Sequence, residues 1–182
     1  VGSGISGSMA ALVAAQSGAK TLLIEKLNRL GGTSRFSGLD FACVGSEAQK
    51  AEGIVDTPEA MVADMSKVAA NLNDRERALN IARNTAKAQK VLLDAGVKWK
   101  ALLKLGGHST KRCLIAEGGG AGILQSVWSN FERYPNLTVM DSTKLDHLIT
   151  NAQGAVIGVE VRKHYLFDAT LKSDDRDNKT GQ

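Results

Sequence analysis

The chain has 182 residues, of which 43% are hydrophobic and 4% aromatic, and a formal net charge of +4. This length provides for one hydrophobic core of ordinary size and not for two large ones. The basic residues are scattered, which argues against a nucleic-acid-binding face, and no apolar run reaches the roughly 18 residues of a membrane span. Cys43 and Cys113 lack metal or haem-attachment spacing, so we expect free thiols. Composition therefore agrees with a soluble α/β protein that has no direct membrane span, and the compartment, cytoplasmic or periplasmic, is left open.

Three glycines with G-x-G-x-x-G spacing, Gly2, Gly4 and Gly7, stand at the start of the chain. Gly2 is expected to turn the chain tightly, Gly4 to let the backbone approach a pyrophosphate, and Gly7 to let a helix pack closely on a strand. Small and apolar residues from Gly4 to about Ser17 predict a buried helix, whose N-terminal amides favour an anion. Because only Val1 precedes the motif, we expect the first strand to be truncated.

A short strand and an acidic residue follow this helix. Gly18 is expected to end the helix, Lys20 to Ile24 form an apolar strand, and Glu25 stands at its carboxyl end, about 20 residues after the glycines. A carboxylate in this place accepts hydrogen bonds from both hydroxyls of a ribose and disfavours a ribose phosphate. The order of turn, helix, strand and acid predicts the adenosine half of a dinucleotide site. The alternative is a structural glycine-rich turn with a surface Glu.

A second glycine-rich stretch separates FAD from NAD. The glycine pair Gly31-Gly32 precedes the hydroxyls of Thr33 and Ser34, and Ser37-Gly38 follows. A nicotinamide enzyme has no need of this stretch, so it favours FAD. Thr33 and Ser34 as simple turn-formers are the alternative.

A helical insertion is predicted at about residues 56–97. Thr57 as N-cap and Pro58 in the first turn begin a helix that continues to Leu72. Asn73 or Asp74 caps a second helix, which Gly96 ends. Both helices are interpreted as structural elements that carry no catalytic residues.

A glycine-rich connection over residues 105–122 leads into a helix at about residues 121–133. Strands are predicted at residues 137–140 and 145–161, the latter broken by a turn at residues 151–154. His108 in the connection is a candidate contact to substrate or flavin, with a structural role as the alternative. The polar end, residues 172–182, is predicted to be a loop or tail.

These motifs resemble the flavoprotein subunits of fumarate reductases and succinate dehydrogenases, together with soluble fumarate and urocanate reductases and ketosteroid dehydrogenases. The resemblance implies an α/β, Rossmann-like FAD-binding domain of the glutathione-reductase-like three-layer type over residues 1–171. It further implies that the chain is incomplete, since the capping domain of the family would follow residues 172–182. Members that attach FAD covalently use a histidine near the ring segment, and residues 35–43 contain none. We therefore expect non-covalent FAD.

The implied chemistry is hydride transfer from flavin N5 to an unsaturated carboxylate such as fumarate, with a separate electron-donor domain or haem protein. Family members often have His-Arg-Pro where this chain has Leu114-Ile115-Ala116, which leaves the acceptor open. No residue is assigned a catalytic or metal-binding role, because the family's substrate-binding residues lie outside this segment. The predicted cofactor-binding residues are Gly2, Gly4, Ser6, Gly7, Glu25, Lys26, Gly31, Gly32, Thr33, Ser34, Ser37, Gly38 and Lys144. An NAD-binding dehydrogenase domain and an inactive fragment are the competing hypotheses.

Overall fold

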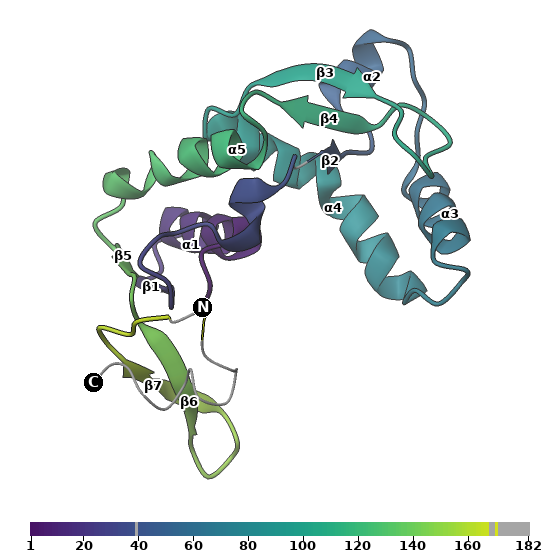
Figure 1. Cartoon of the computed structure of the whole chain (residues 1–182). Helices are drawn as coiled ribbons and strands as arrows, with labels where there is room; N and C mark the ends of the chain where they lie inside the picture. The colour runs from purple at the N-terminus through teal and green to yellow at the C-terminus, as the bar shows by residue number, and fades with distance from the viewer. Residues whose placement is uncertain (39, 168–169, 171–182) are drawn as a thin grey trace. The chain divides into compact units, whose positions relative to one another are not determined.

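The computed structural model describes residues 1–38, 40–167 and 170 (Figure 1). They form two compact units. One contains residues 1–35 together with the chain from Asn130 onward, and the other contains residues 36–129. The polar tail predicted at residues 172–182 lies outside the described residues.

The first unit is built on a parallel pair of short strands. Its elements are α1 (Ile5–Gln16), β1 (Thr21–Ile24), η1 (Gly32–Phe36, which ends at the junction), η2 (Phe131–Arg133), β5 (Leu137–Met140), β6 (Lys144–Thr150) and β7 (Val156–Arg162). β1 pairs with β5 from Thr21 opposite Leu137 to Ile24 opposite Met140. The buried face of α1, with Ala11, Leu12 and Ala15, covers this pair. The helix, the strand β1 and the strand β5 predicted from the sequence are thus confirmed.

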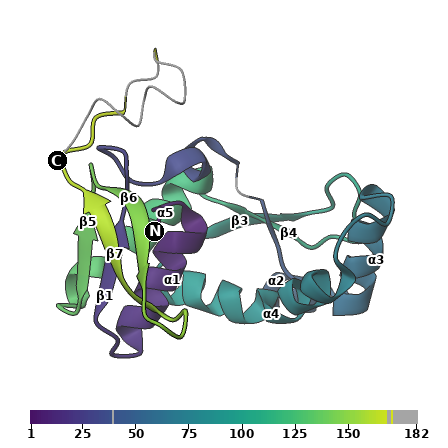
Figure 2. The same ribbon diagram turned by 90° about the horizontal axis from the view of Figure 1, so that it is seen from below.

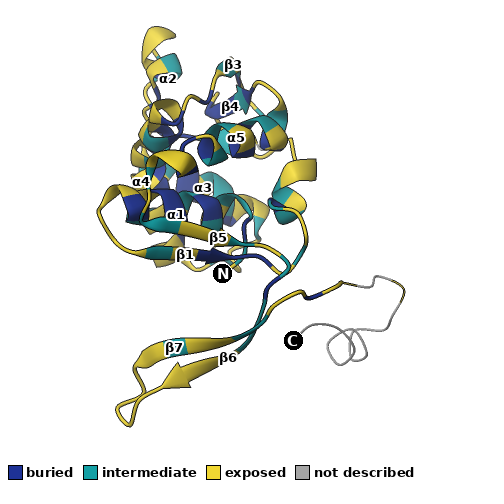
Figure 3. Cartoon of the chain, turned by 90° about the vertical axis from the view of Figure 1, so that its left-hand side faces the viewer, coloured by how far each residue is buried: buried dark blue, intermediate teal, exposed yellow. Residues whose placement is uncertain are grey.

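Strands β6 and β7 form an antiparallel hairpin, as predicted from the turn residues. The Asn151 carboxamide accepts hydrogen bonds from the amides of Gln153 and Ala155, and Gly154 has a φ of 78°. Most residues of the hairpin are exposed, as the colouring in Figure 3 shows.

The second unit combines a three-stranded antiparallel sheet with helices (Figure 2). Its elements are β2 (Phe41–Ala42), α2 (Glu47–Ala51), α3 (Pro58–Val68), α4 (Arg75–Asp94), β3 (Trp99–Leu103), β4 (Cys113–Ala116) and α5 (Gly119–Trp128). The strand order is β2-β4-β3. One apolar cluster joins α3 to α4 through Met61, Val62, Ala78 and Ala82, with Val44 beside them. A second cluster, around Cys43, Leu102 and Leu114, includes the stacked rings of Phe41 and Trp99.

The caps of the two helices predicted in the insertion are confirmed. Thr57 Oγ1 accepts a hydrogen bond from the Ala60 amide at 3.1 Å, and Asp74 Oδ1 accepts one from the Arg77 amide at 3.0 Å. The extension of the first helix to Leu72 is wrong, since α3 ends at Val68. Ala70 and Asn71 have positive φ values, so the chain leaves the right-handed helical conformation there.

Two further sequence predictions need correction. The helix expected at residues 121–133 begins at Gly119 and ends at Trp128. At its end the Ser129 hydroxyl donates a hydrogen bond to the Ser126 carbonyl, and residues 131–133 form a separate 3-10 turn. The glycine-rich connection contains β4, and β2, β3 and α2 were not predicted. Both cysteines are buried and free.

Candidate functional site

A cavity of about 480 Å³ opens in the first unit where α1, the end of β1 and the start of β6 meet. Seven of the residues that line it were predicted from the sequence: Gly2, Gly4, Glu25, Lys26, Gly32, Thr33 and Lys144. Three more were missed, Val1, Ser3 and Thr143, whereas Leu145 was expected as a neighbour of the adenine from the family resemblance. The structure therefore brings together both glycine-rich stretches, the acid and the start of β6.

The glycines are required because the backbone passes close to itself at the start of α1. A Cβ on Gly7 would lie 1.8 Å from the Gly2 carbonyl oxygen, which only a backbone shift would relieve. The Gly2 amide in turn donates a hydrogen bond to the Ile24 carbonyl at 2.7 Å. The motif thus holds the beginning of the helix against the end of β1.

The first amides of α1 face the second glycine-rich stretch. The Ile5 amide donates a hydrogen bond to Ser34 Oγ at 3.1 Å, and a Cβ on Gly4 would lie 3.4 Å from the same oxygen. These amides are free of intrahelical partners, so the helix end favours negative charge. Gly4 lines the cavity here, and Ser34 supports it from the second glycine-rich stretch.

Glu25 is 6% exposed, and its carboxylate is held by three donors. Oε2 accepts hydrogen bonds from the Ser3 amide at 2.9 Å and the Ser3 hydroxyl at 2.6 Å, and Oε1 accepts one from the Leu27 amide at 2.9 Å. Burial alone raises the pKa of Glu25, but the hydrogen bonds from Leu27 and Ser3 outweigh it, and the pKa lies below its ordinary value. Glu25 is therefore a carboxylate at neutral pH.

The carboxylate of Glu25 is an acceptor that lines the cavity. A carboxylate offers about four acceptor positions, and the described residues fill three of those on Glu25. Glu25 therefore lies in the cavity wall as a fixed, charged acceptor. Ser3 also accepts a hydrogen bond from the Gly31 amide at 2.8 Å, so its hydroxyl joins the acid to the glycine pair.

The start of β6 forms the opposite wall of the cavity. The Thr143 amide donates to the Glu25 carbonyl at 2.9 Å, which fixes this loop to the end of β1. Lys144 binds Asp146 at 2.9 Å, and the Lys26 ammonium lies 5.3 Å from the centroid of the Phe167 ring. Lys144 and Leu145 complete this wall, and the family resemblance implies that the adenine lies against them.

The other predicted residues lie elsewhere. Gly7, Gly31 and Ser34 support the wall without being among its lining residues, and Ser6 is exposed in the first turn of α1. Ser37 and Gly38 belong to the second unit, where the Ser37 carbonyl accepts a hydrogen bond from the Gly120 amide at 3.0 Å. Binding of the cofactor by these two residues stays a prediction.

Residues 1–179 match the family described as FAD binding domain. The chain belongs to this family. The FAD-binding domain is 33% identical over 171 residues to the acrylate reductase flavoprotein subunit of Shewanella woodyi, covering 92% of this chain and 34% of that protein. It is 37% identical over 163 residues to the urocanate reductase of Eggerthella lenta, covering 88% of this chain and 27% of that protein.

Among solved structures, the FAD-binding domain resembles the open conformation of a flavocytochrome c3 fumarate reductase. The TM-score is 0.84 at 26% identity, over 90% of this chain and 29% of that one. The predicted family, fold class and FAD cofactor are thereby confirmed. The FAD-binding domain spans about a third of the length of these relatives.

Within the described residues, no group of three or more His, Cys, Asp or Glu side chains is arranged to hold a metal ion. The helices of the same part of the chain include none that is both long and apolar enough to cross a membrane.

Proposed function

We propose that the chain is the FAD-binding part of a flavin-dependent oxidoreductase that reduces an unsaturated carboxylate, such as fumarate, by hydride transfer from flavin N5. The bound flavin supplies the redox chemistry. The observation that supports this most directly is the cavity in which Glu25, Gly4 and Lys144 meet, in a chain similar to acrylate and urocanate reductases.

Each part of the cavity has a proposed role. Glu25 accepts hydrogen bonds from the ribose, and the first amides of α1 face the pyrophosphate. Thr33 and Ser34 contact the ribityl chain of FAD. The start of β6 at Lys144 lies against the adenine. Substrate-binding residues and the proton donor are supplied by other parts of the full-length protein, together with an electron donor.

Non-covalent attachment is part of the proposal, because residues 35–43 contain no histidine. Acid precipitation of the purified full-length protein should leave a yellow supernatant and a colourless pellet. A visible absorption spectrum of the native protein identifies the flavin first, which separates FAD from the NAD alternative. Yellow colour that stays with the denatured polypeptide would contradict non-covalent binding.

The reaction is tested with the full-length protein and a chemically reduced viologen dye as electron donor. Oxidation of the dye should depend on an unsaturated carboxylate, and fumarate, acrylate and urocanate are the first acids to compare. Saturated acids of the same length, such as succinate for fumarate, serve as controls. A flavin-loaded protein that oxidises the dye with none of these acids would contradict the proposed substrate class while leaving the FAD site intact.

A further inference from the structure

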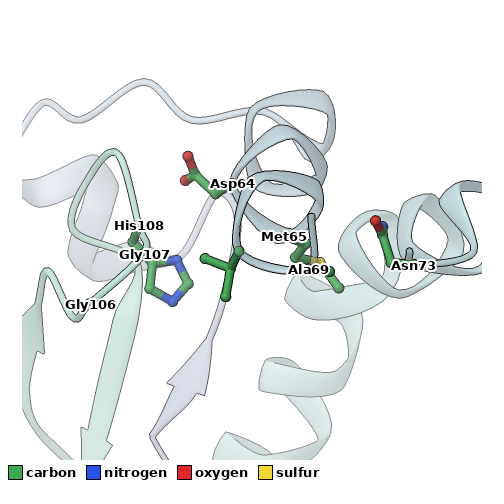
Figure 4. Close-up of a pocket in the computed structure, with 8 residues that line it drawn as sticks. Asp64, Met65, Ala69, Asn73, Gly106, Gly107 and His108 are labelled. Carbon is green, nitrogen blue, oxygen red and sulfur yellow. The ribbon is translucent and has the colours of Figure 1, made fainter. Parts of the chain in front are cut away.

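A recess in the second unit has no part in the function proposed above. One cavity of about 350 Å³ is lined by Asp64, Met65, Val68, Ala69, Asn73, Gly106, Gly107 and His108 (Figure 4). An adjoining cavity of about 490 Å³ shares Asp64, Val68, Gly107 and His108 with it and adds Lys67, Lys104 and Ser109. The two cavities share four lining residues, and we treat them as one recess between α3 and the loop of residues 106–109.

The loop of residues 106–109 is held against α3 by specific contacts, which define the shape of the recess. The Ser109 amide and hydroxyl both donate to Asp64 Oδ2, each at 2.8 Å. Gly107 has a φ of 86°, and a Cβ there would lie 2.7 Å from Val68 Cγ2, so only glycine brings the loop this close to the helix. α3 ends at Val68, which leaves the recess open beyond the last turn.

The floor of the recess is apolar, with two hydrogen-bond donors beside it. Met65, Val68 and Ala69 supply the apolar surface. The Nδ2 atom of Asn73 is buried and has no hydrogen-bond partner among the described residues. A buried donor without an acceptor is unfavourable, and a ligand oxygen would satisfy it.

His108 provides the second donor. Its Nδ1 lies 3.1 Å from NH1 of Arg112. A guanidinium only donates, so Nδ1 acts as acceptor and the proton of this tautomer is on Nε2. The structure gives Nε2 no partner within the described residues. In Figure 4 the His108 ring extends from the loop toward α3.

The charges around the recess favour a single negative charge. Lys67 and Lys104 line it, and neither forms an ion pair with any residue that the structure describes. Asp64 is the one acidic side chain of the lining, and it forms an ion pair with Arg112, which is not among the lining residues. Two lysines against one aspartate leave a formal charge of +1 on the lining.

We propose that this recess binds an amphipathic monocarboxylate, with its apolar body on Met65, Val68 and Ala69 and its carboxylate beside Lys67 and Lys104. The volume falls in the usual range of small-molecule pockets, about 300–1,000 Å³. Asn73 and His108 are two further hydrogen-bond donors in the lining. The proposal does not depend on FAD binding or on the reductase reaction.

Octanoate is the probe, and isothermal titration calorimetry on the full-length, FAD-loaded protein is the measurement. Octanoate should bind saturably, and 1-octanol, which has the same chain without the charge, should bind about tenfold more weakly. Lys67→Glu and Lys104→Glu should each weaken octanoate about fivefold and leave 1-octanol unchanged. Lys87→Glu makes the same charge change on the exposed surface of α4, outside the recess, and should change neither affinity by more than about twofold.

Ala69→Leu should abolish binding of both probes by filling the apolar floor. The lysine variants change exposed side chains, so they test the site even where Ala69→Leu fails to fold. Absence of saturable octanoate binding below about 10 mM would overturn the proposal. Equal affinities for octanoate and 1-octanol would also overturn it, and so would an effect of Lys87→Glu as large as that of Lys67→Glu.

Discussion

The Ser3 hydroxyl donates a hydrogen bond of 2.6 Å to Glu25 Oε2. Ser3 and Glu25 are both buried and stand 22 positions apart in the chain. The same hydroxyl accepts a hydrogen bond from the Gly31 amide. Ser3 thereby connects the first glycine motif, the acid after β1 and the second glycine pair, which are the three parts of the proposed adenosine and pyrophosphate site. Its role is to position Glu25 and Gly31.

Ser3→Ala should weaken FAD binding without unfolding the protein. The change leaves the Ser3 amide bond to Glu25 in place but removes the hydroxyl bonds to Glu25 and Gly31. Since hydrogen bonds to charged groups contribute about 1.5–3 kcal/mol, the dissociation constant of FAD should rise at least about tenfold. Titration of the flavin-free protein with FAD, followed by quenching of flavin fluorescence, measures it. Ser17→Ala, which removes an exposed hydroxyl at the end of α1, is the control and should leave the constant unchanged.

The contribution of Glu25 to the stability of the protein should be lost in acid. Its pKa is lower in the folded protein than in the unfolded chain, so the unfolded chain takes up a proton first as the pH falls. The stabilisation is complete above the ordinary glutamate pKa of about 4.3 and is lost as the pH falls through the lower folded value. Urea unfolding at about pH 7 and about pH 3.5 should show a smaller loss of stability for Glu25→Gln than for the unchanged protein.

Other carboxylates with lowered pKa values, Asp56, Asp64 and Asp146, are present in both proteins and cancel in that comparison. Glu47→Gln is the matched control, because Glu47 lies on the surface beside Lys50. An equal loss of stability in the Glu25→Gln variant and the unchanged protein would show that Glu25 is not held by its donors in solution.

Arg112 should be a major contributor to the stability of the second unit. Its side chain is 0% exposed and binds Asp56, 1% exposed, through two hydrogen bonds of 2.9 Å, as well as Asp64. Burial raises the pKa values of both aspartates, but the bonds to Arg112 and their other donors outweigh it, so both remain charged. Arg112→Met would leave them without their cation.

The expected loss in free energy of unfolding for Arg112→Met is about 3–5 kcal/mol, measured by urea unfolding at neutral pH. Lys90→Met breaks the exposed pair of Lys90 with Asp94 and should cost less than about 1 kcal/mol. Similar losses for the two variants would mean that the buried ion pairs of Arg112 with Asp56 and Asp64 contribute no more to the free energy of unfolding than an exposed pair.

Local patterns predicted the elements whose signals are contained in a few neighbouring residues. The caps at Thr57 and Asp74, the helix after Gly4 and the turn before Gly154 all depend on side chains within four positions. β2 has two residues and β4 has four, and neither shows the alternation by which strands are found. These strands exist because they pair with each other, which the order of residues alone does not reveal.

The residues of the site also divide into those that local sequence patterns predicted and those that they did not. The two glycine-rich stretches and the distance to Glu25 predicted Gly2, Gly4, Glu25, Gly32 and Thr33, whereas Lys144 followed only from the family resemblance. Ser3 was missed because it occupies a variable position of the motif, although a hydroxyl between the first two glycines is the one signal that would have found it. Arg112 and Asp56 stand 56 positions apart, and no local pattern links them.

Gly7→Ala should prevent the first unit from holding its structure around α1. The added methyl carbon would lie 1.8 Å from the Gly2 carbonyl oxygen and 3.0 Å from its carbon, and both are backbone atoms that move only together with the motif. We expect a loss of about 3 kcal/mol or more in the free energy of unfolding and no measurable FAD binding. Gly18→Ala is the control, since a Cβ there meets no atom within 4 Å and the cost is limited to its left-handed φ of 84°. That cost is about 1 kcal/mol, and FAD affinity should be unchanged. Comparable losses for the two variants would show that backbone conformation, and not the approach of α1 to Gly2, is what requires glycine in this motif.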